Sequence, residues 1–268
     1  MKETKKILIA NRGVIAIRAL RAAKELGYEV ASVYSTVDKD QKHLKLSDEA
    51  ICIGPGPAKD SYLNEAAIIA AAELANVDAI YPGYGFLAEN ASFAEKCNES
   101  GFKFIGPDPK VIEIMGDKIK AKELVSSLGI PIVPGYSGDI QSNEQIRSIV
   151  KEIGYPVIVK ATSGGGGKGM RIVNSEDELW DSIVSAQNEA KLAFGDDKVF
   201  IEKYLNKPRH IEIQVFGDGK GKAVHLYSRD CSLQRKYQKI LEEAPALNIS
   251  KEKLDEIQNI CVKACEEM

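Results

Sequence analysis

Four consecutive glycines, Gly164 to Gly167, lie between two short runs that have the composition of β-strands. The run Val157–Val159 is β-branched and follows a proline, and Met170–Val173 resumes a strand-like composition before an Asn-Ser turn. Because glycine has no side chain, backbone N–H groups in such a loop approach an anion closely, and several donors can surround one phosphate. The stretch predicts a glycine hairpin that covers phosphates, with Lys160 at its base.

The same glycines also fit a plain flexible loop without a ligand, and the motif alone leaves this alternative open. Gly164, Gly166 and Gly169 match G-x-G-x-x-G, but a dinucleotide fingerprint or a P-loop opens a helix, whereas this loop leads into another strand. A protein kinase is excluded by order, because its strand lysine follows the glycine loop and Lys160 precedes this one. The sequence therefore favours a hairpin lid over the familiar phosphate loops.

The composition is that of a soluble globular protein without a nucleic-acid or membrane surface. The chain has 268 residues, of which 28% are charged, and a formal net charge of −3. This length allows one large or two modest domains with an ample core. The apolar run Ile7–Ala10 is too short for a signal peptide or a membrane span. We expect a cytoplasmic protein in which any basic site is local.

Five cysteines, an odd number, include no C-x-x-C pair of the kind that zinc and redox sites use. Cys261 and Cys265 stand one helical turn apart, a spacing open to a metal, but Ile257, Ile260 and Ala264 are expected on the same side. Core packing is therefore favoured over ligation for this pair. The others are Cys52, Cys97 and Cys231, and all five are expected to be reduced thiols in or near the core.

Strands alternate with helices through the first half of the chain. Strands are expected over 6–10, 28–34, 50–53, 77–81 and 102–105, and helices over 14–26, 65–74 and 90–100. This alternation predicts a parallel sheet covered on both faces, whose ligands collect beyond the carboxyl ends of the strands. The loops at 11–13, 84–86 and 106–107 leave strands at that edge.

Two residues in these loops are candidate binding residues. Arg12 could bind an anion or could be a solvated loop charge, and the sequence does not choose between the two. Tyr84 is flanked by Gly83 and Gly85 directly after an expected strand, so its side chain could face a cleft. A buried aromatic anchor is the alternative.

A second unit is expected after a helical stretch over 108–129. The helix is interrupted at Gly116–Asp117, and Lys118 begins its second piece. A lysine at the N-terminus of a helix is repelled by the helix dipole unless it binds an anion or faces water, and the sequence leaves both possibilities open. The stretch 130–139 holds two prolines and two glycines and is expected to be a linker.

The glycine hairpin is expected to form a small α+β lid with one helix over 176–193 and a strand over 198–202. Ser175 and Glu178 have the spacing of a capping box. The segment Glu202–Leu205 offers a carboxylate, backbone groups and an apolar side chain, which suit the edge and face of an adenine ring. The apolar side of the helix is expected to carry Trp180, Ile183, Val184 and Ala190.

The last part of the chain is rich in strands and cations. Strands are expected over 209–216 and 223–228, joined by the turn Gly217–Gly221. The segment Arg229–Lys239 is dense in cations and amides, which favours an anion site over a solvated surface. His210 by itself indicates a hydrogen-bonded structural histidine.

Taken in chain order, these motifs resemble those of the biotin carboxylases. The resemblance covers the whole chain and is carried by Asn11–Gly13, Pro82–Leu87, Met115–Lys118, the hairpin at 160–170, Glu202–Leu205, Pro208–Gln214 and Arg229–Lys239. It implies an α/β chain of the ATP-grasp type, in which two α+β lobes hold ATP. The implied reaction is ATP-dependent carboxylation of biotin by bicarbonate through a carboxyphosphate intermediate.

The resemblance also implies domains and site residues. Residues 1–116 would be the N-terminal α/β domain, 117–204 the lid subdomain, and 205–268 the beginning of the C-terminal ATP-grasp lobe. Lys239 would be catalytic, over the γ-phosphate and bicarbonate, and Tyr84 would border biotin. The residues implied for ATP are Lys118 and Lys160 at the phosphates, Gly166 and Gly167 over them, Met170, Glu202, Lys203, Tyr204 and Leu205 at the adenine, His210 and Gln234 at the ribose, and Tyr237.

The same resemblance implies cofactors and partners. ATP, Mg²⁺ (or Mn²⁺), bicarbonate and biotin on a carrier protein would be used. The partners would be a biotin carboxyl carrier protein and the carboxyltransferase component of an acyl-CoA or pyruvate carboxylase, such as acetyl-CoA carboxylase. A homodimer is expected for the full-length protein.

Departures from the family pattern raise alternatives. Val14 replaces the usual Glu, Lys168 an Arg, and Tyr237 a nucleotide-contacting His, which puts one ribose or phosphate contact in doubt. The chain ends at Met268, before the region where the family places its metal-binding glutamates, so we expect no metal ligand here and no activity of this chain alone. A fragment that binds nucleotide or partners without catalysis, and another ATP-grasp carboxylate-amine ligase, stay open.

Overall fold

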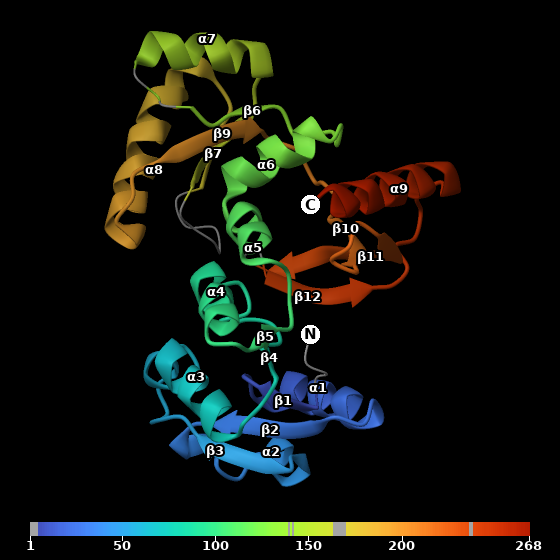
Figure 1. Cartoon of the computed structure of the whole chain (residues 1–268). Coiled ribbons are helices and arrows are strands. Elements are labelled where there is room, and N and C mark those ends of the chain that lie inside the picture. The colour runs from blue at the N-terminus through green and yellow to red at the C-terminus, as the bar shows by residue number, and fades with distance from the viewer. Residues whose placement is uncertain (1–4, 139, 141, 163–169, 236–237) are drawn as a thin grey trace. The chain divides into compact units, whose positions relative to one another are not determined.

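The computed structural model describes residues 5–138, 140, 142–162, 170–235 and 238–268. The chain divides into two compact units, Met1–Asp117 and Lys118–Met268 (Figure 1). Among the described residues, the N-terminal unit contains one sheet and the second unit contains two.

The N-terminal unit is built on a parallel sheet with the strand order β3-β2-β1-β4-β5. The order reverses between β1 and β4, which is where open α/β sheets bind their ligands. The strands are β1 (Lys6–Ile9), β2 (Glu29–Tyr34), β3 (Glu49–Cys52), β4 (Ala79–Tyr81) and β5 (Lys103–Phe104). The helices are α1 (Gly13–Glu25), α2 (Lys42–Leu46), α3 (Glu65–Leu74), α4 (Ala91–Glu99) and α5 (Pro109–Gly116), with short 3-10 turns at Thr36–Asp38 and Ala58–Asp60.

The alternation of side chains along β1 gives this sheet two buried faces. Ile7 and Ile9 pack with Leu20 of α1, whereas Leu8 packs in a separate cluster with Ile68 of α3. Helices α1 and α3 therefore cover opposite faces. The predicted parallel sheet with helices on both faces is confirmed, and α2 is an addition that the sequence did not indicate.

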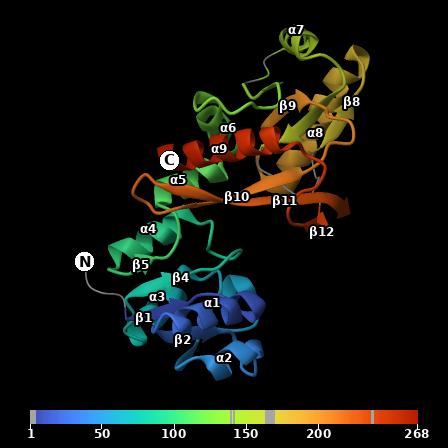
Figure 2. The same cartoon turned by 90° about the vertical axis from the view of Figure 1, so that its right-hand side faces the viewer.

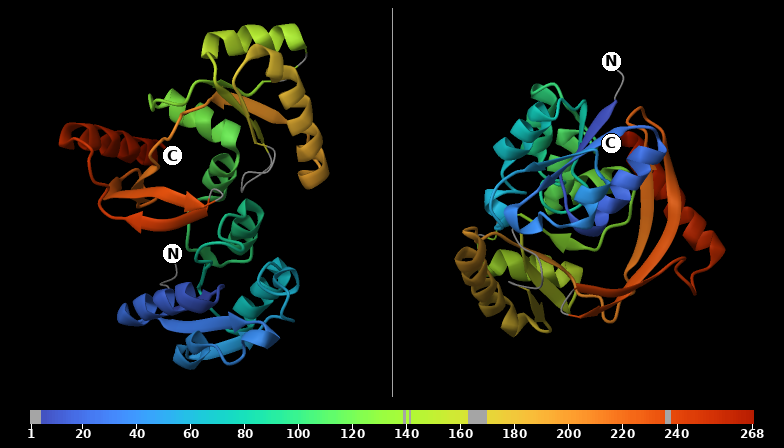
Figure 3. Two further views of the ribbon diagram at one scale, coloured as in Figure 1. Left: turned by 180° about the vertical axis from the view of Figure 1, so that it is seen from behind. Right: turned by 90° about the horizontal axis from the view of Figure 1, so that it is seen from below.

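The second unit begins with an antiparallel sheet of order β6-β9-β7-β8, which we call the lid sheet. Ile146 of α7 and Ile183 of α8 pack with Val157 and Val159 of β7, so both helices cover the same face (Figure 3). The strands are β6 (Gly135–Tyr136), β7 (Val157–Ala161), β8 (Arg171–Val173) and β9 (Val199–Lys203). The helices are α6 (Lys118–Ser127), α7 (Asn143–Ile153) and α8 (Leu179–Phe194), with a 3-10 turn at Glu176–Glu178.

Two expectations about the connections of this sheet were wrong. The stretch 130–139 is not only a linker, because Gly135 and Tyr136 form β6 and pair with Glu202 and Ile201 of β9. The lid was expected to have one helix, whereas the described residues of the lid contain α7 as well as α8. A two-residue strand has no periodicity to detect, so only its pairing with β9 reveals it.

The start and the apolar face of α8 also differ from expectation. Within the described residues Ser175 makes no side-chain cap, and Glu178 instead accepts a hydrogen bond from the backbone N–H of Asn174 at 3.2 Å. The prediction of a capping box is therefore wrong, because a 3-10 turn at Glu176–Glu178 precedes α8. Val184 is 38% exposed. The buried positions are Leu179, Ile183, Ala186 and Ala190.

The second unit ends in an antiparallel sheet of order β10-β11-β12, against which α9 packs (Figure 2). The elements are β10 (Ile211–Gly217), β11 (Ala223–Arg235), β12 (Gln238–Glu243) and α9 (Lys251–Glu267). The expected strands over 209–216 and 223–228 are confirmed. However, β11 continues to Arg235, so the cation-rich segment 229–239 is mostly strand and its side chains are set by sheet register.

The cysteines are all free thiols in the described structure, and Cys97 and Cys231 are buried. Cys261 and Cys265 are partly buried on α9, whereas Cys52 is exposed, contrary to expectation. In the described part of the chain, no helix combines the length and the apolar character needed to cross a membrane.

His43 of α2 is fully buried in the N-terminal unit with one ring nitrogen satisfied. Its Nε2 lies 3.3 Å from the carbonyl oxygen of Val33, and its Nδ1 has no hydrogen-bond partner among the described residues. Burial lowers the pKa of His43 by more than the Val33 carbonyl and the charge of Asp38 raise it.

We predict that the N-terminal unit loses stability as the pH falls from 7 to 5. An unfolded histidine has a pKa of about 6.5, and that of folded His43 is lower. The unfolded chain therefore takes up the proton first, and the free energy of unfolding falls as the pH drops below about 6.5. Urea unfolding at several pH values, read from hydrogen exchange of β1 and β2, measures the loss. His43→Gln should remove most of it and His225→Gln, in the other unit, should not; equal losses in both variants would contradict the assignment.

Candidate nucleotide and anion site

The lid sheet carries a charged pair on the face opposite α7 and α8. Because Val157 and Val159 pack under the helices, alternation along β7 directs Lys160 to the other face. Lys160 is opposite Phe200 in the antiparallel register, which places Glu202 diagonally across on the same face. Lys160 Nζ donates to Glu202 Oε2 at 2.6 Å. The Glu202 side chain is only 8% exposed, whereas that of Lys160 is 30% exposed, so the carboxylate is buried and the ammonium group reaches solvent.

A second ammonium group reaches the same carboxylate. Lys122 of α6 pairs with Glu202 Oε1, and its Nζ lies 4.7 Å from the centre of the Phe200 ring, while Lys160 Nζ lies 5.9 Å from that centre. Sequence analysis did not select Lys122. The available signal was its spacing of four residues from Lys118, which places two residues on one helix face.

The strand end that was expected to meet an adenine is fixed by contacts of its own. Lys203 Nζ donates to the carbonyl oxygens of Gly154 at 3.0 Å and Tyr155 at 2.8 Å. The backbone N–H of Tyr204 donates to the carbonyl of Pro156 at 3.0 Å. The Lys203 side chain therefore ties the end of β9 to the start of β7, and its backbone N–H donates to the carbonyl oxygen of Pro134 at 2.8 Å, so neither of these groups is left for a ligand.

A pocket of about 420 Å³ lies between α6 and the strands β6 and β9. Its described lining includes Lys122, Tyr136 and Phe200 but neither Leu205 nor Met170. Leu205 is 48% exposed after β9, and Met170 is partly buried just before β8. The pocket thus borders the charged cluster and does not bring together the apolar residues expected near an adenine.

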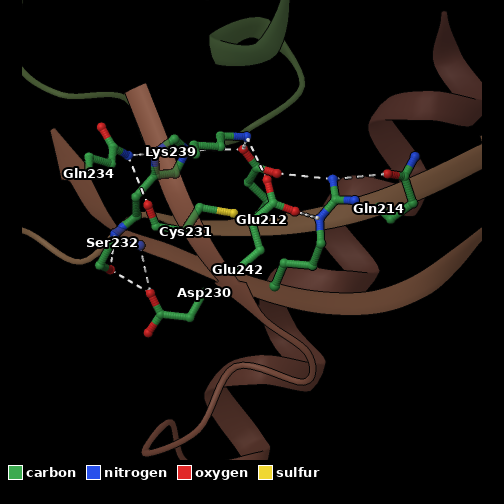
Figure 4. Close-up of polar contacts among 10 residues, drawn as sticks. Glu212, Gln214, Asp230, Cys231, Ser232, Gln234, Lys239 and Glu242 are labelled. Atoms are coloured by element: carbon green, nitrogen blue, oxygen red, sulfur yellow. Dashed lines mark hydrogen bonds and ion pairs between the residues drawn. The ribbon is translucent and has the colours of Figure 1, made fainter. Parts of the chain in front are cut away.

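Glu212 of β10 is the centre of the polar cluster in Figure 4. Its carboxylate pairs with Lys239 of β12 and accepts a hydrogen bond from Arg229 of β11 at 3.0 Å. His210 Nε2 lies 3.2 Å from Glu212 Oε1, and Lys239 Nζ lies 3.9 Å from Glu242 Oε1. The sheet therefore brings the expected catalytic lysine beside two carboxylates and a guanidinium group. Sequence analysis did not select Glu212, although its spacing of two from His210 predicts one shared face of a strand.

These contacts favour the ionised forms of Glu212 and Lys239. The hydrogen bond from Lys239 lowers the pKa of Glu212 most, burial opposes this, and the bond from Arg229 lowers the pKa further. The same bond raises the pKa of Lys239. A lysine whose pKa is raised stays protonated at neutral pH, so the cluster presents a fixed cation.

The two residues expected at a ribose lie against each other. Gln234 Nε2 is 2.8 Å from His210 Nδ1 and donates to the carbonyl oxygen of Cys231 at 2.9 Å. The backbone N–H of His210 donates to Ser232 Oγ at 2.8 Å. Hydrogen bonds from Ser232 and then Arg209 lower the pKa of Asp230, which lies in β11, to about 2.

The N-terminal unit fixes the Tyr84 loop at the edge where β1 and β4 end. Asn11 is buried, and its Nδ2 donates to the carbonyl oxygens of Pro82 at 2.7 Å and Tyr84 at 2.9 Å. Gly83 has a φ of +72°, and a Cβ there would lie 2.8 Å from Asn11 Nδ2, so only glycine fits. The Tyr84 side chain is 67% exposed. The alternative of a buried anchor is therefore wrong.

Arg12 is an ion-paired residue of the same loop edge. Its Nη1 lies 3.0 Å from Asp38 Oδ2, and its guanidinium carbon lies 5.1 Å from the ring centre of Tyr62 and 5.6 Å from that of Phe86. Burial would raise the pKa of Asp38, but hydrogen bonds from Ser35, Tyr62 and Arg12 together lower it. Arg12 is therefore ion-paired within the N-terminal unit and is not a fully solvated charge.

Several expected site residues lie outside the described structure. These are Gly166, Gly167, Lys168, Tyr237 and the side chain of Lys118, whose backbone begins α6. Val14 is 80% exposed at the start of α1. Among the described residues, no three His, Cys, Asp or Glu side chains gather at a possible metal site.

Comparison with protein families gives two matches that together span almost the whole chain. Residues 3–112 match "Biotin carboxylase, N-terminal domain", and residues 117–268 match "Carbamoyl-phosphate synthase L chain, ATP binding domain". Biotin carboxylase of Haemophilus influenzae is 54% identical over 264 residues, which is 98% of this chain and 59% of that protein. The chain thus spans about three fifths of the length of this relative.

Solved structures give the same result. The complex of biotin carboxylase with β,γ-ATP from Campylobacter jejuni has a TM-score of 0.91 at 49% identity, covering 98% of this chain and 59% of that one. The biotin carboxylase domain dimer of Hydrogenobacter thermophilus 2-oxoglutarate carboxylase, with MgADP, ADP and bicarbonate, has a TM-score of 0.89 at 47% identity, covering 100% and 59%. The fold class predicted from the sequence, α/β of the ATP-grasp type, is confirmed. The chain belongs to the biotin carboxylase family, with a biotin carboxylase N-terminal domain followed by an ATP-binding domain of the carbamoyl-phosphate synthase L chain type.

Proposed function

We propose that this chain is the nucleotide-binding part of a biotin carboxylase, an ATP-dependent ligase that carboxylates biotin with bicarbonate through carboxyphosphate. The observation that carries the proposal is the pair of Lys160 and Glu202 on one face of the lid sheet. Lys160 precedes residues 163–169 in the chain, and we propose that its ammonium group lies at the base of the glycine segment. A positioned cation there suits the phosphates of ATP. The ATP and MgADP held by the similar enzymes support the same ligand.

The remaining nucleotide contacts follow from this placement. In the proposal, Lys118 joins Lys160 at the phosphates, and Gly166 and Gly167 close over them. The adenine meets Met170 and the segment Glu202–Leu205, in which the side chain and the backbone N–H of Lys203 are already bonded within the chain. The contact between His210 and Gln234 supports a shared role at the ribose, with Tyr237 nearby in sequence.

Lys239 is the proposed catalytic residue. As a bicarbonate oxygen bonds to the γ-phosphorus and the bond to the ADP oxygen breaks, negative charge passes from bicarbonate to the phosphoryl group and the leaving ADP, and a fixed ammonium group stabilises that charge. Glu212 and Arg229 set the position of Lys239 in the sheet. For biotin we propose Tyr84, which is exposed on a loop that Asn11 holds in place.

The proposal also includes Mg²⁺ and partner proteins, on the basis of the similar proteins. The Hydrogenobacter thermophilus domain holds MgADP. The described residues of this chain do not include three His, Cys, Asp or Glu side chains close enough to hold a metal ion by themselves. We propose a biotin carboxyl carrier protein and a carboxyltransferase component as partners, and a homodimer, as in that relative. The proposed domain bounds are 1–116, 117–204 and 205–268. The cytoplasmic location stays a prediction.

We predict that Lys160→Ala weakens ATP binding. Loss of one charge-assisted contact to a phosphate should reduce the binding free energy by about 1.5–3 kcal/mol. Calorimetric titration of the chain with ATP measures the change. Lys198→Ala removes an exposed lysine just before β9 and should bind like the wild type. Equal affinity of Lys160→Ala and the wild type would refute the assigned role.

A second prediction concerns catalysis in a chain extended to the length of the relatives. Lys239→Met should lower biotin- and bicarbonate-dependent ATP hydrolysis by at least about 100-fold, as expected when a positioned charge is removed from the transition state. ATP affinity should change by no more than about twofold, because binding relies on several other contacts. Lys222→Met, on the turn between β10 and β11, is the matched control.

The outcome separates the proposal from its alternatives. ATP binding by the extended wild-type chain without biotin-dependent hydrolysis would favour a nucleotide-binding protein without this catalysis. Hydrolysis that depends on a carboxylate and an amine instead of biotin would favour another ATP-grasp ligase.

A further inference from the structure

Glu202 is a buried carboxylate with a cation on each of its two oxygens. Oε2 accepts a hydrogen bond from Lys160 at 2.6 Å, and Oε1 pairs with Lys122 of α6. The carboxylate side chain is 8% exposed, whereas the side chains of Lys160 and Lys122 are 30% and 34% exposed. The anion is therefore enclosed by the sheet, and both cations can reach solvent.

This arrangement matters because the proposed function, on which the inference rests, uses only one of the two cations at the phosphates. When Lys160 turns toward a phosphate, its interaction with Glu202 weakens. A buried carboxylate that loses its partner is strongly destabilised. With Lys160 as its sole partner, Glu202 would therefore compete with the nucleotide for the same ammonium group.

We infer that Lys122 is a positioning residue of the nucleotide site, which keeps Glu202 paired while Lys160 binds phosphate. The two lysines occupy different oxygens, so Lys160 can leave without displacing Lys122. Lys122 comes from α6 and Lys160 from β7, so the two ammonium groups are carried by different elements (Figure 1). The ring of Phe200, which is directly opposite Lys160 in the lid sheet, has its centre 4.7 Å from Lys122 Nζ and holds it by a cation–π contact.

Calorimetric titration with ATP, ADP and adenosine tests this role. Lys122→Met keeps an unbranched side chain over Phe200 but removes the charge. We expect it to weaken ATP and ADP binding about tenfold, the effect of one charge-assisted contact, and to leave adenosine binding within about twofold. Lys122→Arg should recover most of the affinity because it restores a cation for Glu202. Lys198→Met, which removes an exposed lysine near the same strand, should bind all three ligands like the wild type.

A double variant distinguishes action through Glu202 from direct contact with phosphate. Glu202→Gln removes the charge that competes for Lys160, so adding Lys122→Met to Glu202→Gln should leave ATP affinity within about twofold of Glu202→Gln alone. If Lys122→Met weakens ATP binding about tenfold in the Glu202→Gln background as well, then Lys122 touches the nucleotide itself and the inference is overturned.

The remaining outcomes are equally decisive. Unchanged ATP affinity in Lys122→Met, with normal binding by the wild type, would overturn the inference and leave the proposed function intact. Equal weakening of adenosine and ATP would also overturn it, because that pattern indicates a change in the fold and not in phosphate binding. Failure of the wild type to bind ATP at all would overturn the proposed nucleotide site and the inference with it.

Discussion

The lid sheet depends on a buried carboxylate whose charge must be matched. One face of the sheet packs under α7 and α8 through Val157 and Val159, and the other carries Lys160 and Glu202. A slip of one residue between β7 and β9 would turn Lys160 toward the apolar helices and leave Glu202 unpaired, both at high cost. The ion pair therefore favours the register in which Lys160 and Glu202 share one face of the sheet, so the structure and the proposed ligand binding require the same pairing.

The same arrangement, a carboxylate paired with several basic side chains, is found in the sheet formed by β10, β11 and β12. There Glu212 contacts Lys239 and Arg229, whose positions are set by the antiparallel pairing of the strands. It also contacts His210, which lies two residues before it in the chain. In both sheets a carboxylate of the chain itself pairs with the cations. The carboxylate orients these side chains, and in the proposed function a phosphate-bearing ligand competes with it for them. Affinity then depends on what else can neutralise that carboxylate once the ligand binds.

Periodicity and motif order determined the larger part of the architecture. Alternation of short β-branched runs with amphipathic helices predicted the parallel sheet, because such strands are buried on both faces and need crossover helices. The glycine stretch predicted a hairpin lid with Lys160 at its base, and β7 and β8 flank residues 163–169. Seven motifs in one order carried the family resemblance. Each of these features is local or depends only on the order of segments along the chain.

Only the tertiary structure decided which side chains meet. The two-residue period of a strand predicts that His210 and Glu212 share a face. Only the register of β10, β11 and β12 places Lys239 beside them. The spacing of Lys122 says which side of α6 it occupies, not that Glu202 lies there. Arg12 was undecided between anion and solvent until the fold placed Asp38 beside it. A sequence determines local conformation through propensity and period, whereas the partner of a charge is fixed by long-range packing, which no local pattern encodes.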